Sequence, residues 1–194
     1  SLYGTHPYSL DQSGEIDTVQ SLTVAHLRQF YQTHYKAKSA VIYLIDALQP
    51  AEAKQIAEHL SAGLPQGPAV AAVPPVPALK NASEKKLPHP ALQAHILLGQ
   101  PGNKRGDPDF FPLYVGNYIL GGGGFVSRLT EEVREKRGLA YSVYSYFLPM
   151  AELGPFQIGL QTKKEQAEEG LKLVKQTVQQ FVDKGVSEKE LQAA

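Results

Sequence analysis

Two side chains that can donate hydrogen bonds to a peptide carbonyl lie close together in this sequence, on either side of a glycine. Arg134 stands near the end of a charged segment, Tyr141 opens an alternating apolar stretch, and Gly138 separates them. A guanidinium offers five N–H donors in a fixed fork and a phenol offers one more. If the chain reverses at Gly138, both side chains reach one surface, where they can hold a carbonyl and the oxyanion that develops on it.

The charges around Arg134 also allow a plain structural interpretation. Its neighbours carry both signs of charge and are Glu131, Glu132, Glu135, Lys136 and Arg137. Such a pattern is typical of a solvated helix that is stabilised by ion pairs between residues three or four apart. Spacing alone favours this second interpretation.

The four consecutive glycines Gly121 to Gly124 are the other conspicuous feature near Arg134. A phosphate-binding loop would continue with Gly-Lys-Ser or Gly-Lys-Thr, but this run continues with Phe125, Val126 and Ser127, and no dinucleotide fingerprint can be laid over it. The run is either a mobile turn between two helices or a loop that leaves room for another group to approach the backbone closely.

The chain carries no recognisable zinc motif. A catalytic zinc helix places two histidines four residues apart with a glutamate beside the second, and the nearest match is the run Gln55 to His59, with glutamine in place of the first ligand. The other histidines show no paired spacing, and cysteine is absent, which excludes thiolate zinc sites and disulfides. We therefore predict no metal ligands and no catalytic residue of the chain's own.

Composition indicates an ordinary globular protein. Hydrophobic residues make up 42% of the chain and the formal net charge is zero, so the basic surface expected of a nucleic-acid binder is missing. No apolar run approaches the roughly 20 residues of a membrane-spanning helix. The lack of cysteine suits the bacterial periplasm and the cytoplasm, and we slightly favour the periplasm.

A proline-rich stretch over residues 64–90 divides the chain, because such a segment is extended and builds no core. Before it we predict a helix that Thr23 caps, a strand over 40–45 and a helix from Pro50 to about Gly63. After it we predict a further set of elements. They are a strand over 94–98, a helix from Asp107 through Ile119, a helix over 125–137, strands over 141–147 and 156–160, and a long helix that Gly185 ends.

This tally of elements predicts an α+β fold. The connection over 149–154 is too short for a crossover helix, so the strands on either side of it should be antiparallel. In the first of these strands Tyr144 and Tyr146 alternate with Val143 and Ser145, and we interpret the tyrosines as packing residues.

The stretch from Leu120 to Tyr146, which contains the glycine run and the sequence R-E-K-R-G-L-A-Y, resembles the C-terminal region of the pitrilysin/insulinase family of zinc metallopeptidases. That group includes the mitochondrial processing peptidases. The resemblance extends over nearly the whole chain through the H-P-Y of His6 to Tyr8 and the helix that ends near Tyr31. It departs at Ile45-Asp46-Ala47, where the family usually has Gly-Asp.

The resemblance implies a function and a site. In that family an arginine and a tyrosine at the positions of Arg134 and Tyr141 hold the substrate, and the glycine loop Gly121, Gly122, Gly123 and Gly124 borders the substrate chamber. The zinc would come from an H-x-x-E-H motif in a partner lobe or subunit, and the substrates would be unfolded peptides. The alternative is a catalytically inactive structural or assembly subunit of the same family.

The resemblance also implies an architecture. Residues 1–63 would form the end of a preceding lobe, 64–90 a linker, and 91–194 a C-terminal-type peptidase lobe that is truncated at its C-terminal end. The lobe would be an antiparallel or mixed sheet with helices packed on one face. We expect the first lobe to be incomplete, so that its exposed strand edge pairs with a neighbouring molecule, including a second copy of the chain.

Overall fold

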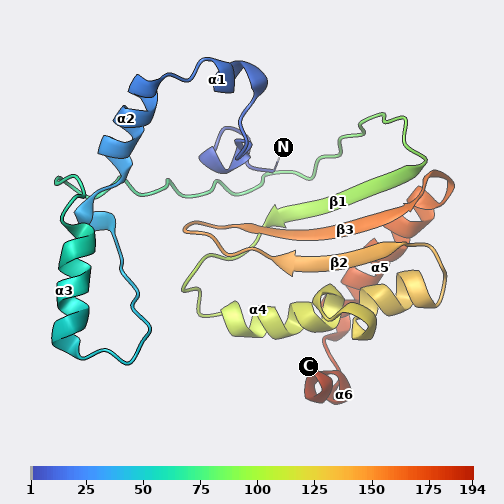
Figure 1. The fold of residues 1–194 in the computed structure, drawn as a ribbon. Helices are drawn as coiled ribbons and strands as arrows, with labels where there is room; N and C mark the ends of the chain where they lie inside the picture. The colour runs from blue at the N-terminus through green and yellow to red at the C-terminus, as the bar shows by residue number, and fades with distance from the viewer. Residues whose placement is uncertain (1) are drawn as a thin grey trace. The chain divides into compact units, whose positions relative to one another are not determined.

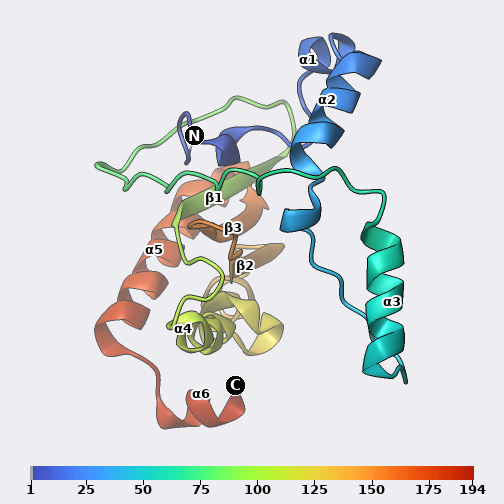
Figure 2. The ribbon, with the colours of Figure 1, turned by 90° about the vertical axis from the view of Figure 1, so that its left-hand side faces the viewer.

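The computed structural model describes residues 2–194, which divide into two compact units, a helical unit (Leu10–Val73) and a sheet unit (residues 2–9 with Pro74–Ala194). The α-helices are α1 (Ile16–Gln20), α2 (Val24–His34), α3 (Pro50–Ser61), α4 (Phe110–Asn117), α5 (Ala167–Lys184) and α6 (Glu188–Ala193). The strands are β1 (Gln93–Pro101), β2 (Ser142–Phe147) and β3 (Pro155–Lys163). Figures 1 and 2 show these elements in two views.

Shorter helical turns complete the list. A first π-helix spans Tyr118–Gly122 and a second spans Thr130–Glu135. Turns of 3-10 helix occupy Pro7–Ser9, Ala37–Ser39, Gly124–Val126 and Lys164–Gln166. No helix or strand lies within 62–92, the range that contains most of the proline-rich stretch. The predicted domain boundaries stay a prediction.

The helical unit begins its two longer helices where the sequence signals predict. The Thr23 hydroxyl accepts a hydrogen bond from the backbone N–H of His26 at 3.3 Å and caps α2. At the start of α3 the Glu52 carboxylate accepts from the backbone N–H of Gln49 at 2.9 Å, and Pro50 occupies the first turn, where no intrahelical donor is needed.

The strand predicted over residues 40–45 is wrong for this structure. These residues form no ladder with any described segment, and Tyr43 and Ile45 are 84% and 97% exposed. A strand exists only when a neighbouring strand accepts and donates its backbone hydrogen bonds, and an apolar run cannot report whether that neighbour is present.

The sheet unit contains a three-stranded antiparallel sheet in the order β1-β3-β2. The register places Ile96 of β1 and Val143 of β2 on either side of Leu160 in β3. The predicted antiparallel pairing of the last two strands and the α+β class are both confirmed, because the connection between β2 and β3 is a short hairpin.

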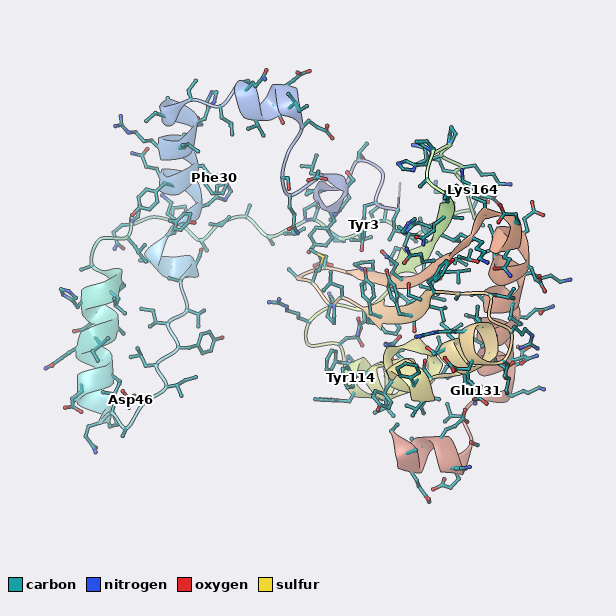
Figure 3. The ribbon with its side chains drawn as sticks, turned by 45° about the vertical axis from the view of Figure 1, so that its right-hand side comes forward. Tyr3, Phe30, Asp46, Tyr114, Glu131 and Lys164 are labelled. Carbon is teal, nitrogen blue, oxygen red and sulfur yellow. The ribbon has the colours of Figure 1, made fainter. Side chains whose placement is uncertain are left out.

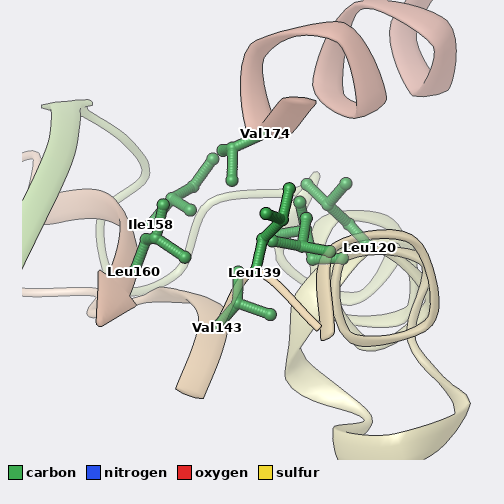
Figure 4. Close-up of a cluster of buried hydrophobic side chains, with 8 residues drawn as sticks. Leu120, Leu139, Val143, Ile158, Leu160 and Val174 are labelled. Atoms are coloured by element: carbon green, nitrogen blue, oxygen red, sulfur yellow. The ribbon is translucent and has the colours of Figure 1, made fainter. Parts of the chain in front are cut away.

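One face of this sheet carries the hydrophobic core. The buried cluster comprises Leu120, Leu129, Val133, Leu139, Val143, Ile158, Leu160 and Val174. Val174 projects from α5 toward the strand residues Ile158 and Leu160, and Leu120 reaches the same centre from the first π-helix (Figure 4). The strands alternate, so every second side chain enters this layer, and helices therefore cover only that face.

The opposite face of the sheet carries Tyr144 and Tyr146. Their rings stack with centroids 6.1 Å apart, and Tyr144 lies directly over Gly159, where an added Cβ would come within 2.4 Å of the Tyr144 ring. Tyr144 is 42% exposed. The interpretation of both tyrosines as packing residues therefore applies to this outer face and not to the core.

The helix predicted over 125–137 differs in detail from the structure. After the 3-10 turn at Gly124–Val126 the chain passes into the second π-helix, and α4 likewise begins at Phe110 instead of Asp107 and continues as the first π-helix. The wider turns bury three consecutive residues, Ile119, Leu120 and Gly121, against the sheet. Packing against β2 accounts for these wider turns. A local sequence pattern contains no information about that packing.

A charged clamp joins α6 to the rest of the sheet unit. Arg128 donates from Nε and Nη2 to the two carboxylate oxygens of Glu190, and its Nη2 also donates to the Gly185 carbonyl at 2.8 Å. Its guanidinium lies 5.1 Å from the centre of the Phe181 ring. These bonds and a bond from the Ser187 hydroxyl lower the pKa of Glu190 from 4.5 to about 2.

The clamp predicts an acid-dependent loss of stability. Because the folded-state pKa of Glu190 lies below its ordinary value, its contribution is fully present above about pH 4.5 and is lost as the pH falls through about 2. We expect Glu190→Gln to lower the thermal midpoint at pH 7, and the difference from wild type should shrink toward pH 2. Glu188→Gln on the same helix is the control. A difference that does not depend on pH would contradict this account.

The contact between the first π-helix and β2 predicts a second effect on stability. A Cβ on Gly121 would lie 2.7 Å from the backbone nitrogen of Ser145 and 2.8 Å from Leu129 Cδ1. Gly121→Ala should therefore destabilise the fold by about 1–3 kcal/mol through overpacking. Gly116→Ala is the matched control, since its nearest foreign atom is 3.7 Å away and we expect it to be tolerated. Equal unfolding midpoints in denaturant for both variants would refute the packing argument.

Candidate functional site

The glycine run forms the end of the first π-helix and the start of the following 3-10 turn, and packing alone requires three of its four glycines. An added Cβ on Gly121 would meet Ser145, one on Gly122 would meet the Asn117 side chain at 2.6 Å, and one on Gly123 would meet the Tyr118 carbonyl at 2.7 Å. Gly124 has open space around it but adopts a φ of +60°, which side-chain-bearing residues rarely adopt. The run is therefore a tightly packed turn.

Polar side chains that the sequence analysis missed hold this turn in place. Asn117 donates to the Ser145 carbonyl at 3.1 Å, and the Ser145 hydroxyl donates back to the Asn117 side chain at 2.7 Å. Ser127, which is fully buried, donates to the Gly124 carbonyl at 2.7 Å and bonds to Thr130 at 3.1 Å. A single asparagine inside the apolar run of α4 was the available signal, because a polar group buried there needs a partner.

Arg134 lies at the exposed side of the second π-helix. Its side chain is 42% exposed, its Nε lies 3.5 Å from a Glu135 carboxylate oxygen, and its guanidinium carbon lies 5.0 Å from the centre of the Phe125 ring. Within residues 2–194 its guanidinium makes no hydrogen bond to the protein. Its two terminal Nη groups therefore keep their donor capacity.

The two other arginines of the same segment differ from Arg134 in this respect. Arg128 is committed to Glu190 and to a backbone carbonyl, as described above. Arg137 donates from Nη1 to the carbonyl of Glu132 at 2.9 Å and to its carboxylate at 2.7 Å. Arg128 and Arg137 thus have structural hydrogen bonds, and the pair of Lys136 with Glu132 fits the solvated-helix interpretation, whereas Arg134 has no equivalent structural task.

Tyr141 lies just before β2, and its backbone N–H donates to the Gln161 carbonyl at 2.8 Å. Its side chain is 52% exposed, and in the described part of the chain its hydroxyl has no hydrogen-bond partner. The reversal between Arg134 and Tyr141 occurs at Gly138, whose φ is +62° and whose N–H donates to the Arg134 carbonyl at 2.8 Å. The prediction that Gly138 ends the helical segment is confirmed.

Buried residues next to Arg134 and Tyr141 in sequence anchor the backbone that carries these two side chains. Val133 and Leu139 belong to the core, the Leu139 N–H donates to the Val133 carbonyl at 2.9 Å, and Thr162 donates to the Leu139 carbonyl. Arg134 follows Val133 directly, so a rigid backbone presents it to solvent. The structure shows no hydrogen bond or ion pair between Arg134 and Tyr141 themselves. Their joint action on a substrate remains a prediction.

The surface around the turn is apolar. Phe125 and Val126 are 70% and 68% exposed, and Phe111 and Tyr114 of α4 are 74% and 62% exposed. Figure 3 labels Tyr114 on α4 and Glu131 on the second π-helix, the elements on either side of the glycine run. These four large apolar side chains are therefore exposed on two elements next to the glycine run in sequence.

The described residues do not form a metal site. Within residues 2–194 no three histidine, aspartate or glutamate side chains are grouped so that they could hold a metal ion. The run Gln55 to His59 lies on α3 of the helical unit, where Glu58 pairs with Lys54 at 3.8 Å. Among the same residues no helix is long and apolar enough to cross a bilayer.

Comparison with known proteins gives a consistent picture. A crystal structure from Pseudomonas fluorescens, described as a peptidase M16 inactive domain, is 44% identical and superimposes with a TM-score of 0.95 over 99% of this chain and 46% of its own. An uncharacterized zinc protease of Streptomyces coelicolor is 31% identical over 98% of this chain and 43% of its own length. A Helicobacter pylori protein that is named a non-peptidase homolog is 32% identical over the whole chain and 44% of its own length.

The chain thus spans less than half the length of each of these relatives. A profile of the family described as "Peptidase M16 inactive domain" matches residues 21–194, which include both candidate residues and the glycine run. The fold, the match over most of the chain and the identity to named zinc proteases agree with one another. The chain belongs to the peptidase M16 family of zinc proteases and corresponds to its inactive domain.

Proposed function

We propose that this chain is the substrate-binding, non-zinc part of a zinc metalloendopeptidase that cleaves unfolded peptides. Arg134 is the observation that carries the proposal, because it is the one arginine of the three in 128–137 whose guanidinium makes no hydrogen bond to the described residues, and its side chain is exposed. The relatives named zinc proteases support the reaction class. Zinc would come from a partner lobe or subunit, since the described residues do not fit a zinc site.

The chemistry assigned to this chain is binding and charge stabilisation. The Nη groups of Arg134 and the hydroxyl of Tyr141 would donate hydrogen bonds to the carbonyl at or beside the cleaved bond. Donors that are fixed before the reaction stabilise the developing oxyanion most strongly, because they need no rearrangement. The exposed apolar side chains Phe111, Tyr114 and Val126 would be available to contact the side chains of an unfolded peptide.

A structural or assembly subunit without peptidase work is the second candidate. The Helicobacter relative that is named a non-peptidase homolog favours it. The two candidates differ in what they require of Arg134 and Tyr141. A structural subunit needs neither donor, whereas a substrate-binding part needs both.

The first prediction concerns metal binding. The isolated chain should bind no zinc with structural or catalytic affinity and should hydrolyse no peptide, because it has no cysteine and no paired-histidine motif. The measurement is zinc content by elemental analysis after dialysis against a weak chelator, with a peptide-hydrolysis assay on the same sample. One zinc ion per chain after dialysis would refute the prediction.

The second prediction concerns the two donors. In the complete protease, with its zinc-bearing lobe or subunit present, Arg134→Ala or Tyr141→Phe should each lower kcat by about 10²–10³, the usual cost of removing one oxyanion donor. The double variant should lose less than the product of the two single losses, because residues that act as a unit are not additive. The measurement is kcat and KM on an unstructured peptide.

Zinc content and thermal midpoint should stay at wild-type values in both variants, since both side chains are exposed. Glu135→Ala is unsuitable as a control because Glu135 pairs with Arg134, so Lys172→Ala on α5 serves instead and should leave turnover unchanged. Wild-type turnover in both Arg134→Ala and Tyr141→Phe would leave the structural subunit as the surviving function.

A further inference from the structure

Phe125 is a large apolar side chain that is exposed to solvent in this fold. It occupies the 3-10 turn Gly124–Val126 directly after the glycine run and is 70% exposed, so it contributes little to the core. Its ring lies under the guanidinium of Arg134, with 5.0 Å between the ring centre and the guanidinium carbon. This distance is within the range of an attractive cation–π contact.

The backbone of the turn fixes where the Phe125 ring lies. Gly124 takes a φ of +60°, the Ser127 N–H donates to the Gly124 carbonyl at 3.1 Å, and the fully buried Ser127 hydroxyl donates to the same carbonyl at 2.7 Å. Ser127 also bonds to Thr130 of the second π-helix. The turn and the helix that carries Arg134 are thus bonded together, so the backbone of Phe125 is held beside the segment that carries Arg134.

The contact on Arg134 leaves its hydrogen-bonding groups usable. An aromatic ring takes one flat face of a guanidinium, whereas the N–H donors lie in the guanidinium plane. Glu135 lies near the Nε edge at 3.5 Å, which leaves the Nη edge for another acceptor. Arg128 differs in this respect. Its guanidinium also lies over an aromatic ring, that of Phe181, but it donates hydrogen bonds to Glu190 and Gly185.

We infer that Phe125 is a positioning residue, whose ring holds the Arg134 guanidinium so that its Nη donors face the substrate carbonyl. The inference rests on the proposed function and adds a role for the glycine run. The run ends in the turn that places the ring, so the conformation of this loop sets the orientation of the substrate-binding arginine. Phe125 itself need not touch the reacting atoms.

The test is a double-mutant cycle in the complete protease, with an unstructured peptide as the probe. Phe125→Leu removes the ring and keeps an apolar side chain, and it should lower kcat/KM by about two- to fivefold, the magnitude of an exposed cation–π contact. In the Arg134→Ala background the same change should have no effect. Phe125→Tyr, which keeps an aromatic face, should retain wild-type kcat/KM.

A spectroscopic signature gives a readout that does not depend on turnover. The Nε–H resonance of Arg134 should be shifted upfield by the ring current of the aromatic side chain in the wild type and in Phe125→Tyr, and this shift should be absent in Phe125→Leu. Phe111→Leu is the matched control, because Phe111 is 74% exposed on α4 and does not lie over Arg134. It should leave the Arg134 resonance in place.

The outcomes separate this inference from the function on which it rests. An equal loss from Phe125→Leu in the wild-type and Arg134→Ala backgrounds would overturn it, since Phe125 would then contact the peptide directly. Unchanged kcat/KM in Phe125→Leu beside an impaired Arg134→Ala would overturn the inference and leave the proposed function standing. Wild-type turnover in Arg134→Ala would overturn both.

Discussion

The close approach of the first π-helix to β2 is the contact on which the sheet unit depends. At Gly121 the helix comes so near to Ser145 that an added Cβ would lie 2.4 Å from the serine hydroxyl oxygen. Only glycine permits so close an approach of the helix to the strand. The approach lets Asn117 and Ser145 form two reciprocal hydrogen bonds beside the apolar core. The tight fit thus combines steric and polar requirements at one point of the chain.

This contact also determines where the candidate site lies. Because the first π-helix is held on β2, the chain must leave it through the glycine run, and Ser127 and Thr130 then return it to the same strand, where Thr130 reaches the Val143 carbonyl. Leu129 and Val133 of the returning segment are fully buried in the core. Arg134 and Tyr141 therefore both belong to segments that this contact helps to place, Arg134 on the second π-helix and Tyr141 directly before β2.

The three arginines of this segment show how one charged helix serves two purposes. Arg128 and Arg137 direct their donors to Glu190, Gly185 and Glu132 and hold parts of the fold together. The guanidinium of Arg134 donates no hydrogen bond to the described residues. An exposed ion pair such as that with Glu135 contributes little to stability. The relatives carry names of both kinds, zinc protease and non-peptidase homolog.

Local signals in the sequence were sufficient for the parts of the structure that depend on neighbouring residues. Thr23 and Ser187 cap their helices, Gly138 and Gly185 end theirs at positive φ, and the short connection after Phe147 makes β2 and β3 antiparallel. The resemblance of the stretch around Arg134 identified the family for the same reason, since the motif is continuous. Tertiary structure decided the rest. The run over 40–45 lacks a partner strand, packing on β2 turns two helical segments into π-helices, and only the folded chain reveals that Arg134 keeps its donors while Arg128 does not. These features depend on residues far apart in sequence, because a hydrogen-bond partner or a buried neighbour is supplied by whatever the fold brings alongside.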